Sequence, residues 1–551
     1  SDDADIRKRL RELVWKKGYL VSAAAAKEPE DTVYRLYYAF RSPLNRVQGH
    51  QVLAINRGER EGVLKVSVEM EREAALIPVR RAVLNPGAPA MAFVRAAAED
   101  AYDRLIFPSV EREMRGLLTE QADEGAIKMF GLNLKPLLMQ PPVKGFVTMG
   151  LDPGYRNGCK VAVVDATGKV LDTAVVYPTF SQRKKEEAID ALAKLIRRHG
   201  VAHIAIGNGT ASRETEQMAV ELIQRLGGGV SYMIVNEAGA SVYSASKLAA
   251  EEFPDYDVNL RSAVSIARRL QDPLAELVKI DPKSIGVGQY QHDMPQARLD
   301  ETLSGVVEDC VNAVGVDLNT ASAPLLSYVA GLNNTTARNI VKYREENGAF
   351  TTRKGVLKVP KLGPKAFEQC AGFLRVPESR NVLDHTGVHP ESYGAAEALL
   401  ALCGYSLDDV KAGGLDGLRE RVAAYGEEKA AEVCGVGVPT LRDIVGELVK
   451  PGRDPRDELP RPILRTDVLE MKDLKPGMEL TGTVRNVIDF GVFVDIGVHQ
   501  DGLVHISQLR EGRRVQHPSE VCAVGDIVTV WVLEVDEKKK RISLTMKKPK
   551  G

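Results

Sequence analysis

The chain has 551 residues, with 74 basic and 75 acidic side chains and a formal net charge of −1. A hydrophobic fraction of 44% and a charged fraction of 27% are ordinary for folded globular domains, so global disorder is excluded, and the length predicts about three to five domains. No run of about eighteen uncharged apolar residues occurs, which excludes a membrane-spanning helix, and the balanced charge gives no overall basic surface for nucleic acid.

The cysteines and histidines do not predict a metal or redox centre. Cys403 and Cys434, the closest two of the six cysteines, are 31 positions apart, so no CxxC pair is available for zinc or redox chemistry. A disulfide framework is not expected in a chain of this length, and a reducing cytoplasm is the simplest interpretation. Two histidine pairs with i,i+4 spacing are each interrupted by a glycine, so neither predicts the helical zinc motif of metalloproteases.

The first 144 residues predict a mostly helical region. Ile6, Leu10 and Val14 recur at helical spacing, and helix is expected across residues 1–45. Short strands are expected at 51–56 and 63–68, on either side of a polar turn, and helices return from 90 to 138. Pro141 and Pro142 then predict a domain boundary near residue 144.

Residues 145–280 change to an alternating α/β pattern. Short valine-rich runs separated by turn signals predict a three-stranded meander, followed by two helices that alternate with two strands. The expected strands are 146–152, 160–165, 170–177, 201–207 and 230–236, and the expected helices are 184–199 and 214–226. This order predicts a layered α/β domain, and it matches the ribonuclease-H-like topology.

Three carboxylates of this domain are candidate catalytic residues of a metal-dependent nuclease. Asp152 ends the first strand, Glu237 follows the last strand, and Asp272, with Glu276 as its alternative, lies late in the domain. Hydrolysis of a phosphodiester with two metal ions needs three or four converging carboxylates. Structural roles stay open as well, because Asp272 before Pro273 is a good helix cap and the residues after Asp152 are good turn formers.

After a helical connector at 281–318, residues 319–376 predict two successive helix-hairpin-helix motifs. This segment has nine basic and three acidic residues, a net charge of +6. Such hairpins hold a phosphate on backbone N–H groups at a helix N-terminus without reading bases. The expected phosphate-binding residues are Gly331, Asn333 and Arg338 in the first copy and Lys361, Gly363 and Lys365 in the second. Asn333 and Lys361 stand where the usual motif has glycine; Asn tolerates a left-handed backbone, and a purely structural helical hairpin remains the alternative.

Residues 377–472 predict a helical domain that ends in a proline- and charge-rich linker at 451–462. From 473 to 551, alternating apolar residues and glycine-bounded turns predict a small closed β-barrel. Phe490, Phe493 and His505 are expected to form a base-stacking platform, flanked by Arg485 and Arg541 for the nucleic-acid backbone. A bulge at the glycine between the two phenylalanines is expected to bring both rings to one face, and the alternative is that one ring fills the core.

The barrel sequence resembles an S1 domain, an RNA-binding OB-fold, and the order of domains resembles the bacterial Tex family of transcription accessory proteins. The resemblance covers essentially the whole chain. It is carried by the S1 string from Gly477 to Thr545 and by residues 150–158, 286–293, 310–322 and 387–393. It implies a multidomain, mainly α-helical fold with one ribonuclease-H-like (YqgF) α/β domain and a C-terminal all-β OB-fold (S1) barrel. It also implies a further helical region before Ser1, in keeping with the missing initiator Met.

The resemblance further implies a cytoplasmic protein that acts with the transcription apparatus and binds nucleic acid with little sequence preference. Resolvases of the YqgF type have a fuller carboxylate set in the last helix, for which Asp272 and Glu276 are an imperfect substitute. The leading hypothesis is a non-enzymatic accessory factor without a cofactor or a membrane partner. Its expected partners are single-stranded RNA, DNA, and RNA polymerase or the ribosome. The alternatives are a nuclease that depends on Mg²⁺ or Mn²⁺ and a protein-interaction scaffold.

Overall fold

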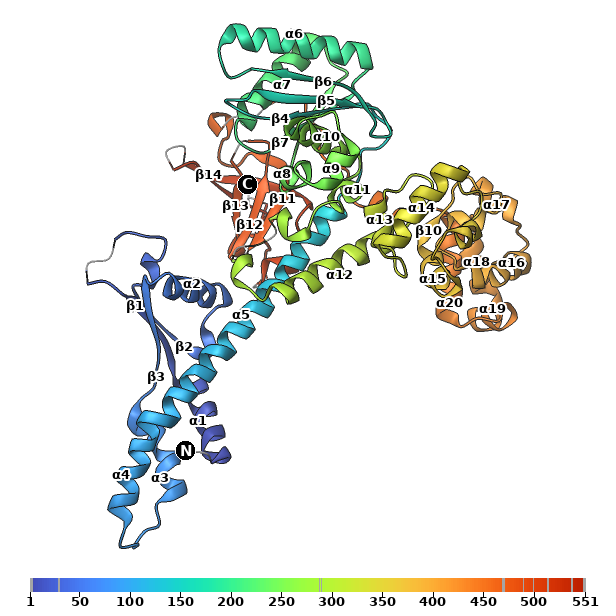
Figure 1. The fold of residues 1–551 in the computed structure, drawn as a ribbon. Coiled ribbons are helices and arrows are strands. Elements are labelled where there is room, and N and C mark those ends of the chain that lie inside the picture. The colour runs from blue at the N-terminus through green and yellow to red at the C-terminus, as the bar shows by residue number, and fades with distance from the viewer. Residues whose placement is uncertain are drawn as a thin grey trace. The chain divides into compact units, whose positions relative to one another are not determined.

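The computed structural model describes residues 3–27, 30–286, 288, 290–467, 471–488, 490–498, 500–512, 515–536 and 539–548. The chain divides into two compact units, Ser1–Gly131 with Val287–Thr302 and Leu132–Gly286 with Leu303–Gly551. Within the described residues, no helix is both long enough and apolar enough to cross a membrane. The expected fold class, a mainly helical multidomain chain with one α/β domain and one β-barrel, is confirmed (Figure 1).

The first unit contains a three-stranded antiparallel sheet with the strand order β2-β1-β3. Its strands are β1 (Tyr19–Ala24), β2 (Ala39–Pro43) and β3 (Leu64–Glu69). Its helices are α1 (Ala4–Lys17), α2 (Gly49–Arg60), α3 (Arg72–Val83), α4 (Met91–Ala101) and the first part of α5 (Phe107–Leu138). Helix α12 (Gln296–Val314) also begins in this unit, and both α5 and α12 continue into the second one.

Two sequence-based predictions for the first unit are wrong. Residues 1–45 hold strands β1 and β2 as well as helix α1, and residues 51–56 lie in helix α2 rather than in a strand. Residues 52–55 are all buried apolar side chains, and periodicity does not separate helix from strand in such a short continuous apolar run. The strand expected at 63–68 is confirmed as β3.

The α/β domain has a five-stranded sheet with the order β6-β5-β4-β7-β8. The strands are β4 (Thr148–Asp152), β5 (Cys159–Val164), β6 (Val170–Val176), β7 (His203–Gly207) and β8 (Ser231–Val235). The helices are α6 (Gln182–His199), α7 (Ser212–Leu226), α8 (Ala240–Ser244), α9 (Lys247–Glu252), α10 (Val258–Gln271) and α11 (Pro273–Leu277). Strands β4, β5 and β6 form the expected antiparallel meander, and β4, β7 and β8 run parallel, so the ribonuclease-H-like topology is confirmed.

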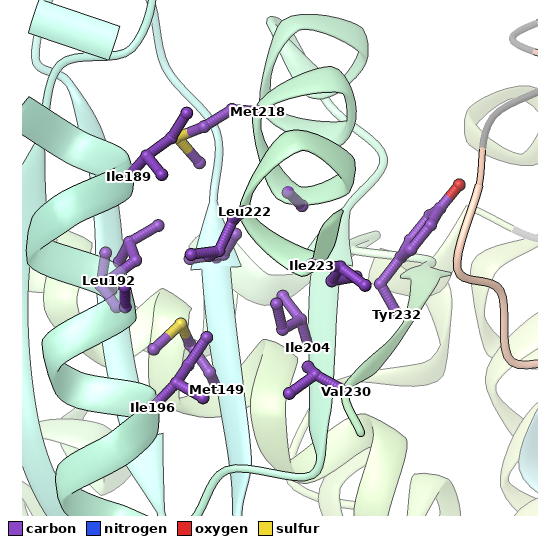
Figure 2. Close-up of a cluster of buried hydrophobic side chains, with 14 of the residues drawn as sticks. Met149, Ile189, Leu192, Ile196, Ile204, Met218, Leu222, Ile223, Val230 and Tyr232 are labelled. Carbon is purple, nitrogen blue, oxygen red and sulfur yellow. The ribbon is translucent and has the colours of Figure 1, made fainter. Parts of the chain in front are cut away.

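Helices cover both faces of this sheet. On one face, α6 and α7 bury an apolar cluster in which Leu192 and Leu222 meet Met149 and Ile204 of the central strands (Figure 2). On the other face, α10 packs so closely on β4 that a side chain at Gly150 would overlap the backbone of Ala263. The small residues Ala263 and Ala267 in α10 allow this approach, and it fixes the position of α10 along β4.

The helical part of the second unit holds two groups of short helices. The first consists of α13 (Ala323–Ser327), α14 (Asn334–Asn347) and α15 (Pro364–Cys370), closed by the parallel pair β9 (Val316–Asp317) and β10 (Leu374–Arg375). The second consists of α16 (Tyr393–Leu402), α17 (Leu407–Ala412), α18 (Leu418–Tyr425), α19 (Glu427–Cys434) and α20 (Val438–Val449), which share one buried apolar cluster.

The C-terminal region is the expected barrel. Its strands are β11 (Glu479–Ile488), β12 (Gly491–Asp495), β13 (Gly502–His505), β14 (Ile527–Asp536) and β15 (Arg541–Thr545), closed in the order β11-β12-β13-β15-β14. Val492, Val494, Val504 and Leu544 point into its buried core. Because side chains alternate along a strand, the residues between them point outward.

The proline- and charge-rich segment before the barrel is not a free linker. Arg456 is only 1% exposed, and its Nη1 donates to Asp272 Oδ1 at 2.8 Å while its Nε donates to Asp454 Oδ1 at 3.0 Å. Further along, Arg465 and Tyr232 of β8 exchange two backbone hydrogen bonds of 2.8 Å each, so the segment adds a bridge to the edge of the α/β sheet. The segment is therefore anchored to the α/β domain at two points.

Candidate nucleic-acid interfaces and a carboxylate pair

The outer face of the barrel carries two of the three residues expected to stack on bases. Phe493 lies on β12 between the buried Val492 and Val494, so its half-buried ring points outward. Strand pairing sets Phe493 opposite Leu503 and Gly491 opposite His505, which places Phe493 and the exposed His505 as diagonal neighbours on one face. The Nδ1 of His505 accepts from the backbone N–H of Ser507 at 3.3 Å, which fixes the orientation of the ring.

Phe490 lies in the turn beside these residues, and the strand pairing at Gly491 is regular, without the expected bulge. Phe490 is 52% exposed, and its carbonyl accepts from the backbone N–H of Ile506, the residue after His505. The irregular pairing lies on β11, between Val484 and Asn486, and not at Gly491. Gly491 has another role, since a Cβ there would lie 2.5 Å from a β13 carbonyl oxygen.

The two flanking arginines are in different states. Arg485, at the irregularity of β11, donates to Asp495 Oδ2 from Nη2 at 2.6 Å and from Nε at 3.2 Å. Burial alone would raise the pKa of Asp495, but Arg485, the backbone N–H of Gly497 and Arg465 lower it below its usual value. Arg541 is exposed at the start of β15. Arg485 is therefore engaged in holding the barrel, whereas Arg541 faces solvent.

Both hairpin copies form, but Asn333 does not have the backbone conformation that was expected for it. The left-handed position is Gly331 in the first copy, with φ +79°, and Lys361 in the second, with φ +65°. Asn333 has φ −136° and is an N-cap, whose side chain accepts from the backbone N–H groups of Thr335 at 2.9 Å and Thr336 at 3.0 Å. The expected left-handed role of Asn333 is thus wrong, since the backbone turns at Gly331 two residues earlier.

Only part of the +6 charge of residues 319–376 reaches the surface. Arg338, Lys361 and Lys365 are exposed, together with Lys342, Lys354 and Lys358. Arg353 is fully buried, with Nη1 donating to the Val388 carbonyl at 2.7 Å and to the Tyr393 hydroxyl at 2.9 Å. Burial lowers the pKa of Arg375 to about 10, and its Nη1 donates to the Gly372 carbonyl at 2.6 Å. The buried arginines support the hairpins, and the exposed cations form the candidate phosphate surface.

Two of the three candidate carboxylates of the α/β domain come together. Asp152 ends β4 and Glu237 follows β8, so both lie at the carboxyl edge of the parallel strands. Burial and then the charge of Glu237 raise the pKa of Asp152 to about 6, and Lys160 opposes this rise. Burial also raises the pKa of Glu237, whose buried Oε2 has no hydrogen-bond partner among the described residues. Glycines at 207 and 209 make room for this carboxylate, because a side chain at either would overlap it.

The third candidate, Asp272, lies at the opposite end of the sheet, which contradicts the predicted convergence. Helix α10 runs antiparallel to β4: Ala267 packs on Gly150, and the side chain of Gln271 donates to the carbonyl of Phe146, before β4 begins. Asp272 follows Gln271 directly, caps α11 through the backbone N–H of Ala275 and pairs with Arg456. Burial alone would raise its pKa, but Arg456 and Lys144 lower it below the usual value.

The remaining donors do not complete a metal site. Glu276, the alternative third acid, is buried in an ion pair with Lys279 at 3.0 Å. Helix α10, whose N-terminal part faces the Asp152 end, contains no acidic residue. In the part of the chain that the structure describes, no group of three or more His, Cys, Asp or Glu side chains is arranged to hold a metal ion. Asp152 and Glu237 alone do not fit the donor set of a two-metal nuclease.

Family models match almost the whole chain. A Tex central region-like model matches residues 1–130, and a Tex protein YqgF-like domain matches 146–271. A helix-hairpin-helix motif matches 311–375, an HHH domain matches 381–456, and an S1 RNA binding domain matches 473–547. The fold and these surfaces define a multidomain nucleic-acid-binding protein. Sequence reasoning missed that residues 381–456 form a second hairpin domain and described them only as helical.

Full-length relatives identify the family. The chain is 52% identical over its entire length to the Bacillus subtilis (strain 168) protein YdcI, of which it covers 76%. It is 50% identical to the "Transcriptional accessory protein Tex" of Neisseria gonorrhoeae, covering 99% of this chain and 72% of the relative. The human "S1 RNA-binding domain-containing protein 1" is 37% identical, covering 99% of this chain and 62% of that protein. The chain belongs to the Tex family.

Proposed function

We propose that this protein is a transcription accessory factor that binds single-stranded RNA and DNA with little sequence preference through its S1 barrel and its hairpins. The observation that carries the proposal is the outer face of the barrel, where Phe493 and His505 are diagonal neighbours and the exposed Phe490 lies in the adjoining turn. Stacking on such rings tolerates any base, because every base has a π-face. The exposed cations of the hairpins add contacts to phosphates, which carry no sequence information.

The transcription role and the cellular partners rest on the family. A relative with 50% identity carries the name Transcriptional accessory protein, and we extend that role to this chain, with RNA polymerase or the ribosome as the assembly on which it acts in the cytoplasm. All six cysteines lie in described parts of the chain and are buried and unpaired, which agrees with a reducing compartment. Because the exposed charge is local, binding is expected to be moderate and to weaken as salt rises.

Replacing all three platform residues by alanine tests the proposal. Each lost base stack is expected to weaken binding of single-stranded RNA by about 1–3 kcal/mol, measured by fluorescence anisotropy at fixed salt. Tyr425→Ala, which removes an exposed ring from helix α18, is the matched control and is expected to bind like the parent. Equal affinity of the triple variant and the parent would contradict the stacking role. No RNA binding by the parent even at low salt would favour the scaffold alternative.

Phosphodiester hydrolysis is the second candidate, and one observation favours it: Asp152 and Glu237 lie together at the carboxyl edge of the sheet. The missing third carboxylate argues against it, and we derive no catalytic step. Incubation of the protein with labelled RNA, DNA and branched DNA in Mn²⁺ or Mg²⁺ decides between the two functions. We expect no cleavage, and cleavage that disappears in Asp152→Asn would establish the nuclease.

A further inference from the structure

Three of the exposed aromatic residues of the α/β domain lie on or beside the loop between β4 and β5. Tyr155 is 47% exposed, Tyr177 is 40% exposed and Phe180 is 58% exposed. Large rings bury substantial apolar area when they pack, so a group of exposed rings indicates a surface that contacts a partner. Neither the barrel platform nor the hairpins explain these rings.

Two of the rings are in contact with each other, and the third lies in the loop against which Tyr177 packs. Tyr177 and Phe180 are in edge contact, with ring centroids 5.2 Å apart and an interplanar angle of 89°. The loop between β4 and β5 joins them, because the Tyr177 ring lies against Gly158, where a Cβ would be 2.8 Å from the ring. Tyr155 is in that same loop, and its hydroxyl donates to Glu214 Oε1 at 2.9 Å. The hydrogen bond and the ring contact hold the rings in place while a large part of each residue stays exposed.

The charged groups around the rings favour a polyanion. Arg156, beside Tyr155, and Arg213, in the first turn of α7, are both exposed. Two acids are engaged in pairs: Glu214 accepts from Tyr155, and Glu187, in the helix that follows Phe180, pairs with Lys184 at 2.7 Å. Asp152 directly precedes the same loop, and the buried Lys160 partly offsets its charge. Aromatic rings interleaved with accessible guanidinium groups are the pattern that contacts single-stranded nucleic acid.

We propose that Tyr155, Tyr177 and Phe180, with Arg156, form a second surface that binds single-stranded RNA by stacking and by backbone contact. We name this surface the loop platform. The proposal rests on the proposed function, because it adds a second RNA-binding surface to the same chain. It assigns to the α/β domain a binding role that needs neither a metal ion nor the third carboxylate.

Helix α7 links the loop platform to the barrel. Glu214 on its first turn holds Tyr155, and Glu216 two residues later accepts from the Tyr232 hydroxyl at 2.8 Å. Glu216 also lies within electrostatic reach of Asp495 on β12 of the barrel. Residues 214 and 216 point to different sides of a helix, so α7 has the loop platform on one side and the barrel on the other. One RNA strand long enough to pass α7 is therefore expected to use both surfaces.

The test uses the full chain and a fluorescein-labelled oligouridine of 20 nucleotides at fixed low salt. The double variant Tyr177→Ala/Phe180→Ala is expected to bind about tenfold more weakly, as loss of one stacked base predicts. Tyr177→Phe/Phe180→Tyr keeps both rings and is expected to restore the parent's affinity. Arg156→Glu, on an exposed loop residue, gives a second variant that does not depend on ring packing and is expected to weaken binding as well. Thermal melting checks that each variant is folded.

The outcomes separate the loop platform from the proposed function. If the parent binds this RNA and the ring and arginine variants bind equally well, the loop platform is refuted and binding through the barrel stands. If alanine variants of Phe490, Phe493 and His505 bind normally while the loop variants fail, the proposed barrel role is refuted and the loop platform stands. Photocrosslinking of 4-thiouridine RNA to peptides containing Tyr155 or Tyr177 supports the proposal directly, and crosslinks confined to the barrel overturn it.

Discussion

The S1 barrel and the α/β domain show two outcomes for residues chosen by similar reasoning. In the barrel, the candidate rings Phe493 and His505 lie as neighbours on one outer face, and Phe490 lies in the adjoining turn. In the α/β domain, Asp152 and Glu237 meet at one edge of the sheet, while Asp272 lies at the other end. The barrel places Phe493 and His505 side by side, whereas the α/β domain separates Asp272 from the other two carboxylates.

The difference follows from what positions each residue. Phe493 and His505 lie on adjacent strands whose register is set by hydrogen bonds between close neighbours, so alternation alone determines their face. The third carboxylate depends instead on the direction of α10. This helix has 14 residues and a length of about 21 Å, and it carries the chain from the Asp152 end to the opposite end before Asp272 is reached. A fold can thus retain the topology of a nuclease while losing the convergence that its chemistry needs.

The largest expected effect on this comparison comes from removing the side chain of Arg456. If Asp272 is structural, Arg456→Ala leaves two carboxylates, Asp272 and Asp454, without their buried partner. Such a loss is expected to lower the free energy of unfolding of this region by about 3–5 kcal/mol. Arg453→Ala, three residues away and paired with the exposed Glu458, is the control and is expected to change it by less than about 1 kcal/mol. Urea unfolding of both variants provides the measurement, and an unaffected Arg456→Ala would remove the structural role of Asp272.

The two separated carboxylates are expected to respond to pH in opposite directions. The folded pKa of Asp152, about 6, lies above the ordinary value of 3.8, so ionisation of Asp152 above pH 6 disfavours the folded state. Asp152→Asn is therefore expected to be more stable than the parent by about 1–2 kcal/mol at pH 7.5, and the gain shrinks as pH falls from 6 to 4. The folded pKa of Asp272 is lowered, so its contribution is present above the ordinary value and is lost as pH falls through the folded pKa.

Asp272→Asn is accordingly expected to be less stable than the parent at pH 7.5, with a deficit that fades in acid as the parent's carboxyl group becomes protonated. Unfolding midpoints of the parent and of each variant, measured between pH 4 and 8, give the stability difference of each variant as a function of pH. Curves of the same sign would mean that the two carboxylates share one environment, contrary to the separation seen here.

Local signals in the sequence were enough for much of the fold. Alternation in residues 491–495 and turn-forming glycines predicted the barrel, and the valine-rich runs predicted the meander β4-β5-β6. Predictions from the local sequence failed where a pattern is compatible with two structures. The apolar residues 52–55 fit a strand as well as a helix, and Asn333 fits a left-handed position as well as the N-cap that it occupies.

The remaining wrong predictions concern residues whose partners are distant in the sequence. Arg456 lies in a proline- and charge-rich stretch that predicts an exposed linker, yet its partner Asp272 is 184 residues away. Arg353 was counted as part of a basic surface, but the backbone carbonyls of residues 384–388 bury its guanidinium. A single sequence does not reveal which distant carbonyl or carboxylate will meet a given arginine, so candidate sites built from charge alone include structural residues.

The smallest expected effects are those of replacing the two arginines of the barrel. They distinguish an arginine that binds RNA from one that stabilises the barrel. Arg541 is exposed, and Arg541→Ala is expected to weaken RNA binding modestly and to reduce the slope of log K against log salt by about 0.7–1, as loss of one phosphate contact predicts. Arg485 is paired with Asp495, so Arg485→Ala is expected to leave the slope unchanged and to lower the melting temperature of the barrel. Arg485→Lys, which keeps the charge without the two-pronged contact, is the matched control for that stability loss. A reduced slope in Arg485→Ala at unchanged stability would show instead that the ion pair opens and that this arginine, like Arg541, contacts phosphate.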